Sequence, residues 1–402
     1  MTARPHLTAV LLFVALGGQV GVWAASLPAV ARELQLGPGA LGLRLGVLAL
    51  VSVVTVLATG RLADAHGRRG VAVAGLVLMA ASYAVFLLGA SPVFASFLVF
   101  AGYGVASGLL DLAANAVGSD LEAATGRKLM VGLHAGFSGG AAVGAASAAL
   151  LAALGFGHHL VFAVVAALLL GAALWTAKAA FPSRHRDTAV EPTAKARSAG
   201  LFGLVGLVIA LGTTCFFGDG VLQSFAPLHL DETIGAGAAG TAFGVALFHA
   251  TSLAGRMAAV PVFSRVGNEI AVLVVCGAVA AASVLVVVVG ATTWLALAGM
   301  AAAGLALSPV IPITYSLLGR SAGDNSGAAI SVLAACSYGA FTAAPAVAGV
   351  LAEGVGLRAA LVPAVCCYAG CAVLALVIRG RGRRETAATP GEEASCQEPF
   401  KR

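Results

Sequence analysis

Residues 45–69 read LGVLALVSVVTVLATGRLADAHGRR, an apolar run that ends in a short, charged turn. The run extends back to Leu41, and a helix that spans a membrane needs about 20 apolar residues. A second apolar run begins at Val71, directly after the turn. Gly60 and Gly67 permit a tight reversal of the backbone. The stretch therefore predicts two membrane-spanning helices joined by a short basic turn.

The composition extends this interpretation to the whole chain. Hydrophobic residues make up 60% of the 402 residues and charged residues 10%, whereas a soluble domain carries about 25% charged residues. Most of the surface must therefore face lipid, and the sequence predicts an all-α membrane protein with twelve transmembrane helices. The apolar runs lie near residues 7–31, 41–61, 71–90, 92–116, 131–154, 159–180, 201–227, 237–262, 270–290, 293–318, 326–350 and 357–379.

A polar stretch divides these runs into two sets of six. The sequence predicts a six-helix bundle over 1–180, a central cytoplasmic loop over 181–200, a second six-helix bundle over 201–379 and a disordered cytoplasmic tail over 380–402. Pro309 and Pro312 predict a break in the tenth helix, and Pro345 predicts one in the eleventh.

The basic residues indicate how the chain is oriented. If both termini are cytoplasmic, Arg32, Arg44 and Arg358 are the only ones of the 23 Lys and Arg residues that fall on the outer side. Loops on the cytoplasmic side of a membrane carry an excess of Lys and Arg. We therefore expect a multi-pass protein of the cytoplasmic (inner) membrane with both termini inside the cell.

The charged turn carries a resemblance to a known family. The segment from Gly60 to Arg69 resembles the signature that follows the second helix in the major facilitator superfamily of transporters. The resemblance implies a fold of two pseudo-symmetric six-helix bundles and a conformational latch in this turn. The residues that match the latch are Gly60, Arg61, Asp64, Gly67, Arg68 and Arg69. A basic turn without a latch function is the alternative. Gly255-Arg256-Met257-Ala258 is a weak second copy that lacks the acid.

Several segments resemble a narrower, bacterial branch of that superfamily related to fucose permease. They are residues 23–30 (WAASLPAV), 111–115 (DLAAN), 134–138 (HAGFS) and 352–353 (AE). Ser26 stands where that branch often has a basic residue, so the substrate does not carry over with the resemblance.

Polar side chains inside the predicted spans are candidates for function because they are costly in lipid. Asp111 and Asn115 are four residues apart on one helix and share a face. His134 lies near the start of the next helix, where it could approach them. We predict a proton-coupling site from Asp111 and His134. A purely structural polar cluster that joins the two helices is the alternative.

The second half of the chain repeats this spacing with Asp219 and Gln223, and the first helix has Gln19 and Trp23 at the same spacing. We predict that Asp219 both binds substrate and couples it to protons. The other predicted substrate-binding residues are Gln19, Trp23, Asn115, Gln223, Tyr315 and Tyr338. Helix packing, or for Trp23 an anchor at the membrane interface, is the alternative role.

Other classes of protein find little support in the sequence. No P-loop, nucleophile elbow or metal-ligand spacing is present, so we expect no enzyme activity, cofactor or metal. His158 and His159 are expected to be solvated in an outer turn, and no basic patch suggests nucleic-acid binding.

These observations favour a monomeric secondary transporter in the lipid bilayer. It would move a small organic molecule by alternating access, driven by protons, in a direction that the sequence leaves open: uptake of a sugar-like compound or export of an amphipathic one. A membrane sensor or assembly partner with the same fold is the alternative function.

Overall fold

The computed structural model describes residues 5–86, 93–127, 129–182, 203–266, 268–322 and 326–388. Within these ranges, the side chains of residues 61–66, 93–95, 259–266, 326–327 and 382–388 are not described. The described chain is helical, and twelve of its helical segments are long and apolar enough to cross a membrane. The predicted fold class is confirmed.

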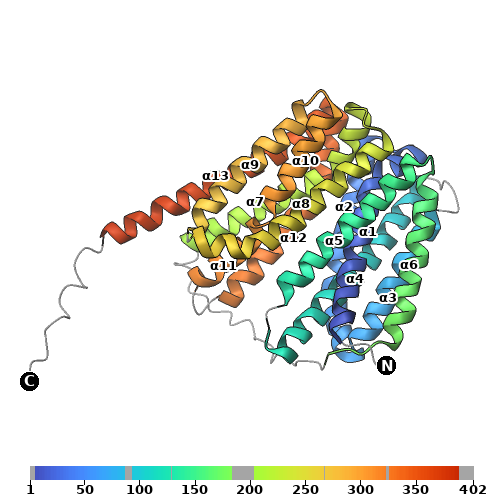
Figure 1. Cartoon of the computed structure of the whole chain (residues 1–402), viewed down its shortest axis with the longest axis horizontal. Coiled ribbons are helices and arrows are strands. Elements are labelled where there is room, and N and C mark those ends of the chain that lie inside the picture. Colours follow the sequence, from blue (N-terminus) through green and yellow to red (C-terminus); the bar gives the residue numbers. More distant parts are fainter. Residues whose placement is uncertain are drawn as a thin grey trace, which may run out of the picture.

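The first half of the chain forms one bundle and the second half another, side by side (Figure 1). The helices of the first bundle are α1 (Pro5–Glu33), α2 (Pro38–His66), α3 (Arg68–Phe86), α4 (Val93–Thr125), α5 (Met130–Ala153) and α6 (His158–Lys178). Those of the second are α7 (Leu204–Leu228), α8 (Gly237–Val266), α9 (Glu269–Val289), α10 (Thr293–Leu307), α11 (Val310–Ala322), α12 (Ser326–Val355) and α13 (Leu357–Ala388). A π-helical turn, η1 (His229–Thr233), extends α7.

The proline predictions have two different outcomes. The tenth span is broken into α10 and α11 at Ser308-Pro309, as predicted. The predicted break at Pro345 is wrong, because α12 runs through it without interruption. Proline frees the carbonyl of Phe341 one turn earlier, and that carbonyl faces Gly220 where α7 approaches closely. A close neighbouring helix allows a spanning helix to accommodate proline.

The ends of the predicted ranges also differ from the structure. Helix α13 continues to Ala388, so residues 380–388 are helical rather than disordered. The segment RGRRETAA continues the helix because Arg, Glu and Ala all have high helix propensity. The rest of the tail and residues 183–200 of the predicted loop lie outside the described residues.

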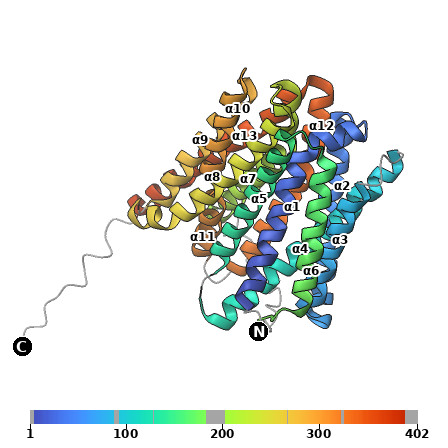
Figure 2. The ribbon, with the colours of Figure 1, turned by 45° about the vertical axis from the view of Figure 1, so that its right-hand side comes forward.

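Small residues bring the helices of the first bundle together. Helix α1 lies beside α5 (Figure 2). A Cβ atom on Gly17 would overlap the backbone of Phe137, and one on Gly140 would overlap the backbone of Val14. Helix association in lipid depends on such close packing, since no hydrophobic force draws the helices together there. The glycines therefore fix the distance between α1 and α5.

The two bundles meet along α2 and α12 and along α5 and α8. Because the described chain has twelve membrane-spanning segments, an even number, its two ends lie at the same face of the molecule. We call this the terminal face, and the opposite face, where α1 ends at Glu33, the distal face. Near the distal face a Cβ on Gly42 of α2 would lie 2.8 Å from the Cα of Gly349 of α12. The two backbones are thus in direct contact.

Candidate functional site

Asp219 lies on α7 with a hydrogen-bond partner on another helix. The hydroxyl of Tyr368, on α13, donates to Oδ1 of Asp219 over 2.7 Å. Tyr368 is fully buried, and its ring packs on Gly218, where any larger side chain would displace it. The sequence predicted Asp219 but not Tyr368, because nothing in the local pattern relates residues 149 positions apart.

Arg256 connects the two bundles next to this acid. Its guanidinium, on α8, donates to the backbone carbonyl of His134 over 3.0 Å and to the hydroxyl of Ser138, both on α5. Its charge interacts with that of Asp219. From the sequence we expected Arg256 on the cytoplasmic side. Its place in the weak second copy of the signature, Gly255-Arg256-Met257-Ala258, was a signal that this residue could have a further role. Asp219, Tyr368 and Arg256, together with Ser138, form what we call the α7–α8 polar group.

Asp111 and Asn115 interact as predicted from their spacing. The side-chain amide of Asn115 donates to Oδ1 of Asp111 over 3.0 Å and to its backbone carbonyl over 2.9 Å. Tyr338, on α12 in the other bundle, interacts electrostatically with Asp111 and with Tyr315 of α11. Tyr338 is 44% exposed. An acid on α4 and a tyrosine on α12 thus influence each other electrostatically across the boundary between the bundles.

His134 does not join Asp111 in the part of the chain that the structure describes. Its ring contacts the ring of Phe13 edge to face, with the centroids 5.1 Å apart. Its backbone carbonyl is the group that accepts from Arg256. Asp111 and His134 were predicted to share one proton-coupling site, and the structure shows each with its own neighbours, on α4 for Asp111 and on α1 and α8 for His134.

Gln19 and Trp23 are buried inside the first bundle. The hydroxyl of Tyr103 donates to Oε1 of Gln19, and that of Tyr83 donates to its backbone carbonyl over 2.7 Å. The Trp23 ring lies 4.4 Å from that of Tyr103, centroid to centroid. Trp23 is 8% exposed and Gln19 1%. This cluster joins α1, α3 and α4.

Two cavities touch predicted residues. Gln223 lines a small cavity of about 10 Å³ between α1, α7, α8 and α10, together with His249. That volume is close to the least that holds one water molecule. Gln19 also lines a larger, apolar cavity of about 680 Å³ between α1, α5 and α6.

The predicted latch residues are described only in part. Gly67 has a φ of +87°, a left-handed conformation that favours glycine. Arg68 bonds Asp120 of α4, with Nε and Oδ2 3.2 Å apart. Arg69 donates to the carbonyl of Ala179 over 2.8 Å and lies over the Phe181 ring. These contacts stay within the first bundle. The side chains of Arg61 and Asp64 lie outside the described residues, whereas Gly60 has open space around it.

The distal face carries polar contacts between the bundles that the sequence did not indicate. Arg32, at the end of α1, pairs with Asp231 of η1. The carboxylate of Glu353, on α12, accepts from the backbone N–H of Gly39 at the start of α2 over 3.1 Å. With the contact of Gly42 and Gly349, these interactions hold the distal ends of the two bundles together.

Comparison with known proteins adds to this geometry. The model of the Major Facilitator Superfamily matches residues 8–218 and 207–401. An uncharacterised transporter of Sinorhizobium fredii, y4wD, is 30% identical over 86% of this chain and 90% of its own. A point variant of the nucleoside transporter NupG superposes with a TM-score of 0.73 over 94% of this chain and 99% of that one, at 13% identity.

A third similar structure is a bacterial homologue of the human lysosomal transporter Spinster, in an inward-facing and occupied conformation. It superposes with a TM-score of 0.72 over 96% of this chain and 98% of its own, at 14% identity. At such identities the likeness of these two structures concerns the fold alone.

Proposed function

Because the chain belongs to the Major Facilitator Superfamily, and is therefore a multi-pass membrane transporter of a small molecule rather than an enzyme, we propose that it is a proton-coupled secondary transporter. The observation that carries the proposal is the α7–α8 polar group. An acid there has a tyrosine partner inside its own bundle and interacts with an arginine that reaches into the other bundle.

The mechanism follows from the charge of Asp219. When Asp219 is ionised, its negative charge favours the guanidinium of Arg256 in the position where it also bonds α5. When Asp219 takes up a proton, that attraction is lost while Arg256 keeps its charge. Proton binding on α7 thereby changes the stability of the contact between α5 and α8. Proton uptake is coupled in this way to a relative movement of the two bundles.

The substrate site that we propose lies between Asp111 and Asn115 of the first bundle and Tyr338 and Tyr315 of the second. These side chains come from both bundles, so a molecule held among them contacts both halves. A carboxylate, an amide and two phenols suit a substrate with hydroxyl or amine groups attached to an apolar body. Both the uptake of a sugar-like compound and the export of an amphipathic one fit this description, and the direction of proton flow separates them.

The remaining predicted residues take other roles in this proposal. Gln223 and His249 line the small cavity beside α1, which has room for about one water molecule. Gln19 and Trp23 set the packing of α1 against α3 and α4, because their polar and aromatic partners lie inside the first bundle. The latch role of the turn at Gly60–Arg69 remains part of the proposal.

We further propose that the terminal face is cytoplasmic and that the membrane is the inner one. Apart from Arg32, Arg44 and Arg358, the Lys and Arg residues fall in the segments that the terminal face would carry, with Arg256 drawn inward. We also propose that the unit of transport is a monomer, a proposal supported by the presence of both bundles in one chain. The variants His6→Cys and His159→Cys, each made in a protein whose native cysteines have been replaced, test this orientation. They are labelled in intact cells with a thiol reagent that does not cross the membrane. Reaction at His6 before the membrane is opened would contradict it.

Transport in proteoliposomes tests the function itself. The purified protein is given an imposed pH gradient, a panel of sugars and amphipathic amines, and a pH-sensitive dye inside the vesicles. Proton movement that depends on a compound supports coupled transport, and its sign separates symport from antiport. If a compound crosses without any proton movement, the coupling proposal is wrong. If binding occurs without flux, the protein is a sensor with the same fold.

A further inference from the structure

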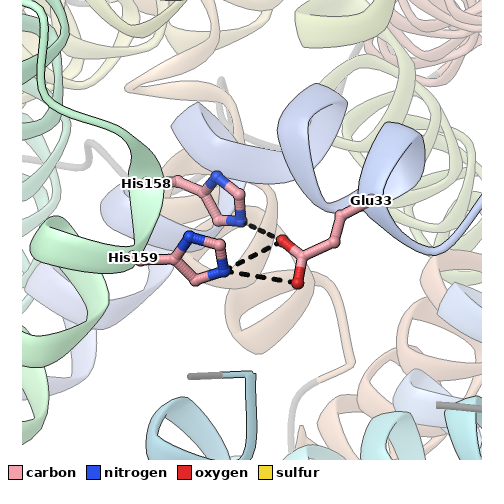
Figure 3. A group of neighbouring side chains, drawn as sticks. All are labelled: Glu33, His158 and His159. Carbon is pink, nitrogen blue, oxygen red and sulfur yellow. Dashed lines mark hydrogen bonds and ion pairs between the residues drawn. The ribbon is translucent and has the colours of Figure 1, made fainter. Parts of the chain in front are cut away.

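Two adjacent histidines and one glutamate converge at the distal face (Figure 3). His158 and His159 are the first two residues of α6, and Glu33 is the last residue of α1. Nε2 of His158 lies 2.6 Å from Oε2 of Glu33, and Nε2 of His159 lies 3.1 Å from the same oxygen. The expectation that both histidines are merely solvated is therefore wrong, because the fold places a carboxylate from a helix 125 residues away beside them.

The three side chains are oriented before any ligand arrives. The His158 ring contacts the fully buried ring of Phe162 edge to face, at 5.4 Å between centroids. The rings of His158 and His159 are tilted by 32° to each other, with their centroids 4.2 Å apart. One donor atom from each of the three residues lies within 4.8 Å of the others. In a tetrahedral zinc site with bonds of about 2.0–2.1 Å, neighbouring ligand atoms are about 3.4 Å apart. The distances from the two ring nitrogens to the Glu33 oxygen, 2.6 and 3.1 Å, are shorter than that, so the side chains must move slightly apart to admit an ion.

We propose that Glu33, His158 and His159 form a binding site for a divalent transition-metal ion of the zinc, cobalt and nickel type. Two imidazole nitrogens and one carboxylate oxygen are a ligand set that these ions favour. His159 has half of its side chain exposed, so the ion enters from the distal side and keeps a coordination position open to water. Each histidine binds through Nε2, which gives up its hydrogen bond to Glu33 for the metal bond.

The position of the site gives the ion a structural consequence. It joins the end of α1 to the start of α6, both in the first bundle, and leaves the second bundle untouched. Glu33 directly follows Arg32, whose ion pair with Asp231 joins the two bundles at this face. A bound ion therefore holds the last turn of α1 in the orientation that this ion pair uses. The inference does not depend on the substrate or on proton coupling.

Metal binding to the purified full-length protein tests the proposal. The purification tag is removed, bound metals are stripped with a chelator, and zinc is titrated by calorimetry while cobalt is followed by its visible absorption. We expect one ion per chain and an absorption band of tetrahedral cobalt. Loss of a ligand should weaken binding at least as much as loss of a supporting hydrogen bond, roughly 10–100-fold, in His158→Gln, His159→Gln and Glu33→Gln.

His6→Gln is the matched control, because His6 is an exposed histidine at the start of α1, at the opposite face. This variant should bind zinc as the unchanged protein does. Thermal unfolding without metal shows whether each variant is folded, and His159→Gln is the most informative because that side chain is the most exposed of the three. If the folded variants of Glu33, His158 and His159 bind zinc as the unchanged protein does, or if no zinc binds to the folded protein, the proposal is wrong. The cluster then only connects α1 to α6 by hydrogen bonds.

Discussion

Asp219 accepts a hydrogen bond from one helix and interacts with a charge on another, and in the proposed mechanism its protonation state sets the strength of the second interaction. Tyr368 donates a hydrogen bond to it from α13, and Arg256 interacts with its charge from α8. A neutral amide in its place has nearly the same shape but carries no charge and takes up no proton. Replacing Asp219 by Asn therefore tests the proposed proton coupling without disturbing the fold.

In Asp219→Asn we expect transport down a substrate gradient to continue, while accumulation driven by a pH gradient falls. A coupling free energy of about 1–3 kcal/mol corresponds to a loss of about 5–150-fold. Substrate uptake into proteoliposomes, with and without a pH gradient, measures both quantities. Accumulation that follows the pH gradient as in the unchanged protein would remove Asp219 from the mechanism.

Tyr368→Phe is the matched control, since it removes the hydrogen bond and keeps both the carboxyl group and the ring on Gly218. This variant should remain coupled to protons. We expect a loss of stability of about 1 kcal/mol, the usual net value of one hydrogen bond.

Arg256 gives a second prediction at this scale. Arg256→Gln removes the charge and shortens the side chain, so the bonds to His134 and Ser138 on α5 are lost. Transport should fall strongly, and Arg256→Lys should restore part of it by restoring the charge without the fork of donors. Initial uptake rates at saturating substrate measure the effect. Equal rates in all three proteins would show that the contact between α5 and α8 has no part in transport.

Single residues were predicted well where one helix contains both partners and poorly where it does not. The spacing of Asp111 and Asn115 predicts their hydrogen bond, because residues four apart share a helix face. The approach of His134 to them stays a prediction, and the contact that the structure shows for its ring is with Phe13 of α1. Tyr368 went unnoticed because its partner lies on a helix distant in sequence.

At the scale of helices, the contact of α1 with α5 depends on glycines that leave no room for a side chain. A Cβ on Gly140 would overlap the backbone of Val14, so Gly140→Ala must push the two helices apart. We expect a loss of about 1–3 kcal/mol, as for other overpacked interiors, seen as a lower unfolding temperature in detergent.

Gly136→Ala is the control on the same helix. A Cβ there would lie 3.8 Å from the nearest side-chain atom of Val14, an ordinary contact. Alanine also has a higher helix propensity than glycine, so this variant should be as stable as the unchanged protein or slightly more so. If both substitutions lower the unfolding temperature equally, the close contact of α1 and α5 is not what limits stability.

The prolines show how far helix breaks follow from sequence. Pro309 ends a helical segment, whereas Pro345 lies within α12. Both remove a backbone hydrogen bond, and a close neighbouring helix is one feature that lets a spanning helix accommodate the freed carbonyl. At Pro345, Gly220 of α7 lets the helices approach closely, and that proximity is a property of the packed bundle.

For the whole molecule, alternating access requires the distal contacts between the bundles to open. Arg32 pairs with Asp231 across the bundles, and Glu353 bonds Gly39. In a protein whose native cysteines have been replaced, we expect a cross-link between Arg32→Cys and Asp231→Cys to stop transport, and reduction to restore it. Substrate uptake before and after reduction is the measurement.

A cross-link between Glu33→Cys and His159→Cys is the control, because it joins two helices of the same bundle at the same face. It should leave transport largely intact, since in the proposed mechanism each bundle moves as one body. Transport that survives the link between the bundles would contradict the rocking of two bundles.

The sequence by itself determined the class of the protein, the twelve spans, the two bundles and the family resemblance. These depend on the length and polarity of local runs, which the physics of the bilayer makes decisive. The tertiary structure alone decided which distant residues meet: Arg256 with α5, Arg32 with Asp231, and Glu33 with two histidines. The reason is that helices associate in lipid through close packing of their whole surfaces, so partners from separate helices leave no local pattern in the sequence.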